Sequence, residues 1–147
     1  EKTPQITTKD TPFEIGKAIK FIEGKDVTII ATGHLVWEAL QAAESLESQG
    51  ISAEVINIHT IKPLDEEAIL ASVKKTKCVV TAEEHNFLGG LGESVSRVLS
   101  TKLPAPQEYV AVKDTFGESG TPEQLMEKYG LNANAIENAV KKVIERK

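Results

Sequence analysis

Apolar positions along this chain of 147 residues follow two spacings. Nearly continuous apolar runs at residues 27–32, 53–58 and 78–82 are typical of strands that are buried on both faces of a sheet. Between these runs, apolar residues recur every three or four positions and predict helices that end near Gly50 and before Cys78. Strands that alternate with helices favour a mostly parallel sheet with helices on both sides and right-handed crossovers.

The chain begins with a different pattern. Apolar residues occupy alternate positions at Phe13, Ile15, Ile19 and Phe21, and a polar turn follows at residues 23–26. This alternation predicts an opening hairpin. Its first strand would be the one antiparallel strand of the sheet.

Further elements follow the third apolar run. Helical spacing at residues 91–99 precedes a short strand at 109–112 and a polar, glycine-containing loop at 113–120. The last helix has an apolar face that begins at Ile136. The lysines and the arginine at its end are interpreted as a solvated face.

Capping residues mark the starts of three helices. Asp65 and Asn132 each precede a segment with helical spacing and are predicted N-caps. Thr121 and Gln124 have the spacing of a capping box, which predicts a short helix that ends at Gly130.

Composition narrows the function classes. Hydrophobic residues make up 40% of the chain and the formal charge is −5, so nucleic acid and anionic membranes are not expected partners. No apolar run approaches the roughly 18 to 20 residues of a membrane-spanning helix. Cys78, the single cysteine, fits a reducing compartment and is interpreted as an inert thiol, so we expect a cytoplasmic protein. The length favours one domain at residues 13–147, after a linker at residues 1–12.

The three histidines occupy equivalent positions in the predicted fold. His34, His59 and His85 each follow one of the three apolar runs, so all three should lie at the edge where the parallel strands end. Acid–base catalysis, a role in lining a cleft or domain interface, and no role at all remain open for each of them. No metal site is expected, because the sequence lacks a close pair of histidine or cysteine ligands.

Polar residues also follow the third apolar run. Glu83, Glu84, His85 and Asn86 are interpreted as a loop beyond the end of that strand, where ligands often bind in open α/β sheets. Adjacent residues of an extended segment point in opposite directions, so at most one of the two glutamates could join His85.

A glycine cluster opens the helix at residues 91–99. Gly89, Gly90 and Gly92 could cradle a phosphate, because a helix N-terminus presents free N–H groups. The cluster has neither the Gly-x-Gly-x-x-Gly spacing nor the Lys-Ser/Thr of a P-loop. The alternative is that these small residues allow close packing against another domain or subunit.

Several motifs in order resemble the C-terminal domain of transketolase. They are residues 31–33 (Ala-Thr-Gly), 58–65 (Ile-His-Thr-Ile-Lys-Pro-Leu-Asp), 83–92 (Glu-Glu-His-Asn-Phe-Leu-Gly-Gly-Leu-Gly), 114–120 (Asp-Thr-Phe-Gly-Glu-Ser-Gly) and 128–131 (Lys-Tyr-Gly-Leu). The resemblance implies a three-layer α/β sandwich around a five-stranded, mostly parallel mixed sheet with one antiparallel strand.

Membership of that family implies an enzyme that transfers a two-carbon ketol unit between sugar phosphates, as in the pentose phosphate pathway. Thiamine diphosphate and Mg²⁺ would be bound by other domains, because the motifs that hold them are absent from this chain. This segment alone would then bind no cofactor or metal and have no activity. Its partners would be the other transketolase domains or a second subunit, in a homodimer of the full enzyme.

The resemblance transfers no catalytic residue, although His85 could approach the active site. The residues that could line an interface or cleft are Gly33, His34, His59, Glu84, His85, Asn86, Gly89, Gly90 and Gly92.

Other origins stay open. Similar domains end 1-deoxyxylulose-5-phosphate synthase and the β subunits of 2-oxoacid dehydrogenases. A stand-alone module that binds a phosphorylated metabolite or a nucleotide at the same sheet edge is a further alternative.

Overall fold

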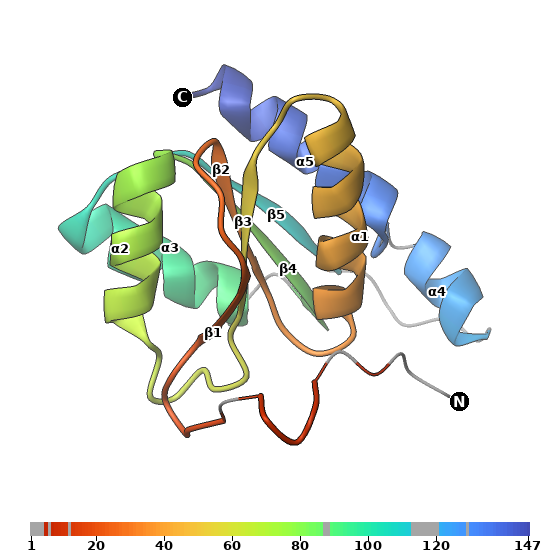
Figure 1. The fold of residues 1–147 in the computed structure, drawn as a ribbon, viewed down its shortest axis with the longest axis horizontal. Helices are drawn as coiled ribbons and strands as arrows, with labels where there is room; N and C mark the ends of the chain where they lie inside the picture. Colours follow the sequence, from red (N-terminus) through yellow and green to blue (C-terminus); the bar gives the residue numbers. More distant parts are fainter. Residues whose placement is uncertain (1–4, 6, 12, 87–88, 113–120, 129) are drawn as a thin grey trace.

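The computed structural model contains one five-stranded sheet with the strand order β1-β3-β2-β4-β5 (Figure 1). The strands are β1 (Ile19–Ile22), β2 (Val27–Ala31), β3 (Ala53–Asn57), β4 (Val79–Asn86) and β5 (Gln107–Val112). The helices are α1 (Leu35–Ser48), α2 (Glu66–Thr76), α3 (Leu91–Lys102), α4 (Pro122–Lys128) and α5 (Ala133–Glu145).

The structure describes residues 5, 7–11, 13–86, 89–112, 121–128 and 130–147. It describes the backbone but not the side chains of residues 85, 86, 122, 123 and 125. The predicted glycine-containing loop at residues 113–120 lies outside the described residues. None of the helices in the described ranges is long and apolar enough to cross a membrane.

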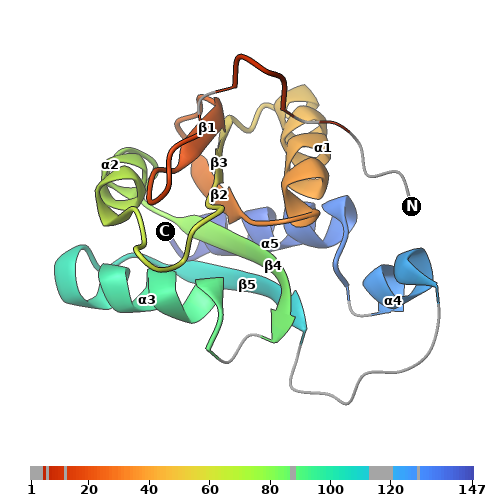
Figure 2. The same cartoon turned by 90° about the horizontal axis from the view of Figure 1, so that it is seen from below.

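The sheet is the middle of three layers. Helices α2 and α3 cover one face, and α1 and α5 cover the other (Figures 1 and 2). Strands β3, β2, β4 and β5 are parallel, and β1 alone is antiparallel. The α/β fold predicted from the sequence, with a five-stranded mixed sheet and one antiparallel strand, is therefore confirmed.

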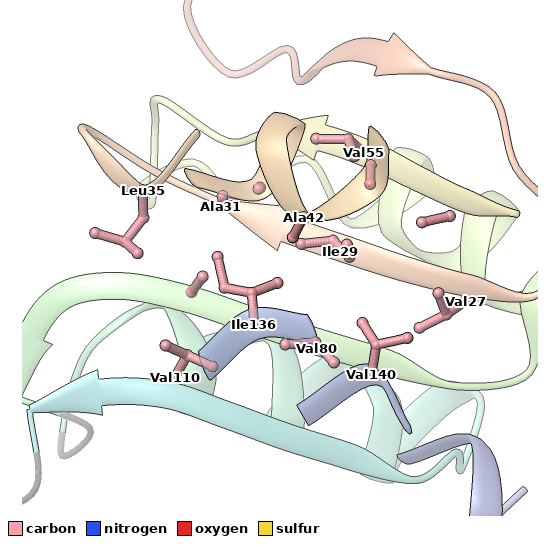
Figure 3. Packing of buried hydrophobic residues seen from close by; sticks show 14 of the residues in the cluster. Val27, Ile29, Ala31, Leu35, Ala42, Val55, Val80, Val110, Ile136 and Val140 are labelled. Atoms are coloured by element: carbon pink, nitrogen blue, oxygen red, sulfur yellow. The ribbon is translucent and has the colours of Figure 1, made fainter. Parts of the chain in front are cut away.

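Strand β2 shows why the apolar runs are continuous. Val27 and Ile29 point to the face that carries α1 and α5, where Ile136 and Val140 of α5 meet them (Figure 3). Ile30 points to the opposite face, in the cluster formed with α2 and α3. Every residue of β2 is buried because both faces are covered, so the strand lacks the regular alternation of apolar and polar residues that a half-exposed strand shows. Its one polar residue, Thr28, is hydrogen-bonded to Ser72 and Thr76 of α2.

The predicted opening hairpin is wrong. Strand β1 begins only at Ile19 and pairs with β3 rather than with β2. Strand β2 already has parallel neighbours on both sides and cannot pair with β1, which instead extends the sheet beside β3. The turn after β1 crosses the backbone of β3 so closely that a Cβ on Gly24 would lie 2.2 Å from the carbonyl carbon of Ala53. Phe13 and Ile15 precede the strand and are exposed.

The interpretation of residues 83–86 as a loop is also wrong. Strand β4 continues to Asn86, which pairs with Val112 of β5 after an irregularity beyond Ala82. The polar side chains concealed the strand in the sequence. The predicted alternation of the two glutamates is nevertheless present, since Glu83 is buried and Glu84 is exposed.

The predicted helix caps are present. Asp65 accepts a hydrogen bond from the Ala68 amide at 3.1 Å, and Asn132 accepts one from the Ala135 amide at 2.8 Å. Thr121 and Gln124 form the reciprocal bonds of a capping box, at 3.2 and 3.1 Å.

The basic end of α5 is not merely a solvated face. Arg146 Nη1 donates to the Gln107 carbonyl at 2.9 Å and to Glu108 Oε1 at 2.6 Å. Lys147 Nζ donates to the Asp26 carbonyl at 2.8 Å. These bonds tie the end of the last helix to the sheet.

A buried carboxylate joins β1, β3 and α2. Glu54 is fully buried on β3 and accepts hydrogen bonds from Ser72 Oγ at 2.5 Å, from the Gly24 amide at 3.2 Å and from Lys75 Nζ. Lys20 Nζ lies 3.7 Å from the same carboxylate. Burial alone would raise the pKa of Glu54, but these donors and the lysine charges together hold it below its ordinary value.

We expect Glu54→Gln to lower the free energy of unfolding by about 2 kcal/mol at pH 7, because it removes a charge-assisted acceptor from a buried network. The lowered pKa of Glu54 means that its contribution is present above the unfolded-state value near 4.5 and is lost as the pH falls through the folded-state value. Urea unfolding should therefore show that the difference in unfolding free energy between wild type and variant shrinks as the pH falls below the folded-state pKa of Glu54.

Glu44→Gln, on the exposed face of α1, is the matched control and should change stability little at any pH. A gap for Glu54→Gln that stays constant from neutral to strongly acid pH would contradict this role of the carboxylate.

Candidate functional site

Three adjacent parallel strands bring the predicted site residues to one edge of the sheet. Strands β3, β2 and β4 are neighbours in the sheet. Strand β3 leads into residues 58–65, β2 leads into residues 32–34, and β4 itself contains residues 83–86 at its carboxyl end. Figure 2 views the fold from below, the side on which these ends lie in Figure 1. The topology therefore places the histidine-containing segments along a shared edge.

Gly33 and His34 form the turn between β2 and α1. Gly33 is exposed and has φ +60°, a left-handed conformation that favours glycine. His34 occupies the N-cap position without a side-chain capping bond, and its Nε2 lies 3.9 Å from Glu38 Oε1. Glu38 in turn accepts a hydrogen bond from the Ala133 amide at 2.8 Å. This corner consequently links α1 to the start of α5.

His59 is held by its neighbours. Its ring stacks on Phe13, with centroids 4.3 Å apart and an angle of 27° between the planes. Nδ1 lies 2.9 Å from the Thr60 hydroxyl oxygen, and Nε2 is buried without a hydrogen-bond partner among the described residues. Neither ring nitrogen faces solvent with a free hydrogen-bonding position, so this arrangement does not favour acid–base chemistry.

Glu83 closes the start of α3. Its side chain is buried, and its two oxygens accept hydrogen bonds from the amides of Leu91 at 2.8 Å and Gly92 at 2.7 Å. A carboxylate at this place also complements the positive end of the helix dipole. The amides that would have bound a phosphate at this helix therefore already bind a carboxylate of the same chain.

The three glycines of the cluster differ in their contacts within the domain. Gly89 has φ +76°, and its amide donates to Glu93 at 2.8 Å. Gly90 is the buried N-cap residue of α3. A Cβ on Gly92 would lie 2.3 Å from the ring of Tyr109, so the missing side chain lets β5 and α3 approach.

The remaining predicted site residues divide into two groups. Glu84 is exposed on β4 and points away from the buried Glu83. The backbone of His85 and Asn86 belongs to β4, but their side chains lie outside the described residues. The predicted interface or cleft role of all these residues stays a prediction.

Sequence reasoning missed the part that Glu83 plays. Its acceptor bonds reach amides eight and nine positions further along the chain, outside the range of a local capping box. The one available signal of this role was the position of Glu83, which alternation along the strand places on a buried face. A buried carboxylate requires hydrogen-bond partners.

Cys78 is the lone thiol and is fully buried just before β4 begins. Burial raises the pKa of this thiol, which disfavours the reactive thiolate. Its Sγ donates to the Asp26 carbonyl at 3.4 Å. This environment agrees with the interpretation of Cys78 as an inert thiol.

The described residues do not fit a thiamine diphosphate or metal site. They contain no group of three histidine, cysteine, aspartate or glutamate residues that could hold a metal ion. The glycine-rich start of α3 has its Leu91 and Gly92 amides bound to Glu83.

We expect Glu83→Gln to lower the free energy of unfolding by about 2 kcal/mol, because the amide group replaces one acceptor oxygen with a donor that faces an N–H group. Urea denaturation measures the change. Glu84→Gln is the matched control and should alter stability by less than about 0.5 kcal/mol, because its side chain is exposed. Equal effects of the two substitutions would show that Glu83 does not hold α3.

Comparisons with known proteins agree with this arrangement. Residues 16–136 match the domain family described as "Transketolase, C-terminal domain". The chain is 50% identical over 143 residues to a 6-deoxy-6-sulfo-D-fructose transketolase subunit, SqwH, of Clostridium sp. (strain MSTE9), covering 97% of this chain and 44% of that protein. It is 45% identical over 130 residues to a putative transketolase C-terminal section of Methanocaldococcus jannaschii, covering 87% of this chain and 40% of the relative.

A solved structure, described as a split gene transketolase in an inactive beta4 tetramer, has the same fold. It superposes with a TM-score of 0.94 at 46% sequence identity and covers 97% of this chain and 47% of its own. The chain thus spans less than half the length of each of these relatives. The extent of the domain match and these identities together show that the chain belongs to the transketolase family, as its C-terminal domain.

Proposed function

We propose that this chain is the C-terminal domain of one subunit of a split transketolase and that it serves assembly rather than chemistry. The whole enzyme transfers a two-carbon ketol unit between sugar phosphates or related sugars. Thiamine diphosphate, bound elsewhere in that enzyme together with Mg²⁺, supplies the nucleophilic carbon that takes up the unit.

One observation carries the assembly role. The glycine-rich helix start that resembles a phosphate cradle has the Leu91 and Gly92 amides bound to Glu83. These two amides, which could otherwise bind an anion, therefore stabilise the fold of the domain itself. With these donors engaged inside the domain, its contribution to the enzyme is through the surfaces that it presents to its neighbours.

The relatives support the split arrangement. Two of them are described as a subunit or a C-terminal section of a transketolase, and the solved relative is described as a split gene transketolase. That solved relative is a tetramer described as inactive, which suits a subunit that needs a companion. The sulfonated sugar named for the clostridial relative is one candidate substrate for the enzyme that contains this chain.

The chain's own residues would contribute by fixing surfaces. Glu38 joins α1 to the start of α5, and Glu83 fixes the start of α3. These bonds hold the sheet edge that carries Gly33, His34 and Glu84 in one arrangement. That edge would then meet the domains that bind the cofactor.

The test is a ketol-transfer assay with thiamine diphosphate and Mg²⁺ on three samples: residues 1–147 alone, the subunit that contains them alone, and that subunit with its companion. The ketose donors should include sugar phosphates and 6-deoxy-6-sulfo-D-fructose. We expect turnover only when both subunits are present, because the cofactor-binding parts lie outside residues 1–147. Turnover by residues 1–147 alone, or tight calorimetric binding of thiamine diphosphate to them, would overturn the proposal.

A further inference from the structure

A corner of the molecule exposes large apolar side chains next to His59. Phe13 is 70% exposed, Ile15 is 77% exposed and Ile61 is 37% exposed. They are three of the four large hydrophobic residues that the described part of the chain exposes. Phe13 stacks on His59, which lies two positions before Ile61. We name the surface formed by Phe13, Ile15 and Ile61 the Phe13 corner.

Several contacts hold the segment that displays Phe13 and Ile15. The Lys17 amide donates to the Glu14 carbonyl at 3.0 Å and closes a turn. The Ala18 amide donates to Asp65 Oδ2 at 2.8 Å, on the same carboxylate that caps α2 through Oδ1. The backbone of this segment is therefore fixed to the domain just before β1 begins.

Gly16 brings the turn against the loop that follows β3. Its amide donates to the Thr60 hydroxyl at 3.4 Å, and its φ of +81° is a conformation that favours glycine. A Cβ at this position would lie 3.1 Å from Pro63, so the two segments touch. The fold thus orders this turn while leaving two large apolar side chains in water, a combination that marks an interaction site.

We propose that the Phe13 corner is the surface on which the preceding half of the parent subunit packs. This inference rests on the proposed function, under which such a half exists. The relatives have more than half of their length outside the region that this chain covers. The region matched to the C-terminal domain family starts at Gly16, within three residues of Phe13.

Connectivity favours this occupant over a second copy or a companion subunit. A preceding domain joined to the turn is confined close to it, at a high effective concentration that a separate molecule does not have. The contact chemistry suits an apolar partner surface. His59 Nε2, a polar atom of the stacked ring, is already buried, so covering Phe13 would remove little further polar surface from water.

Thiol labelling tests the proposal directly. Cys78 is fully buried, so a cysteine introduced at Ile15 reports with little background from this domain, and peptide mapping by mass spectrometry assigns the labelled site. Residues 1–147 are a fair reference, because both apolar clusters lie within them. Ile15→Cys should react rapidly with a maleimide in residues 1–147. It should react at least about tenfold more slowly in the full subunit, where labelling requires local opening.

Two further variants keep the result clear. Ser100→Cys, on the exposed side of α3, is the control and should react at the same rate in both proteins. Ile61→Cys supplies a second position in the corner should Ile15→Cys fail to fold. Unchanged labelling of the corner cysteine in the full subunit overturns the proposal.

Dilution of the subunit and addition of the companion subunit identify which molecule covers the Phe13 corner. Protection that persists in the dilute subunit alone shows that the preceding half covers the corner. Protection that appears only at high concentration, or only after the companion is added, assigns the corner to another molecule and overturns the proposal. Labelling does not depend on turnover, so a protected corner in a subunit that transfers no ketol unit even with its companion present would contradict the proposed function alone.

Discussion

The contact on which this edge of the domain depends is the one between the Glu83 carboxylate and the first amides of α3. It places a buried carboxylate within β4, whose two oxygens accept hydrogen bonds from two N–H groups at the positive end of a helix dipole. The same contact fixes where α3 begins and how closely it approaches β5 at Gly92. A sheet edge that could have bound an anionic ligand instead binds part of its own chain.

The bonds between Glu83 and α3 distinguish this domain from most open α/β sheets. Open α/β sheets commonly bind ligands beyond the carboxyl ends of their strands. Here His59 is stacked and bonded, Glu38 is committed to α5, and the start of α3 is closed by Glu83. These described groups of the edge are thus already engaged in contacts within the domain, which supports the proposed role in assembly.

The sequence predicted the parts of the fold that depend on local signals. Strand β2 was recognisable because both of its faces are buried, and the caps Asp65 and Asn132 because they act within three residues. The pairing of β1 with β3 was missed, since the partner of a strand is not encoded beside it. The polar side chains of residues 83–86 conceal the end of β4 in the sequence, and the role of Glu83 is hidden because its partners lie on the next helix. Phe13 and Ile15 resembled strand residues because an apolar residue does not reveal what covers it.

The most direct test of the central claim is amide NMR of residues 1–147. The resonances of Leu91 and Gly92 should be unchanged when inorganic phosphate, or thiamine diphosphate with Mg²⁺, is added, because Glu83 already accepts from both groups. Saturable shifts of these two resonances on adding either ligand would show that the start of α3 is a ligand site and would contradict the account.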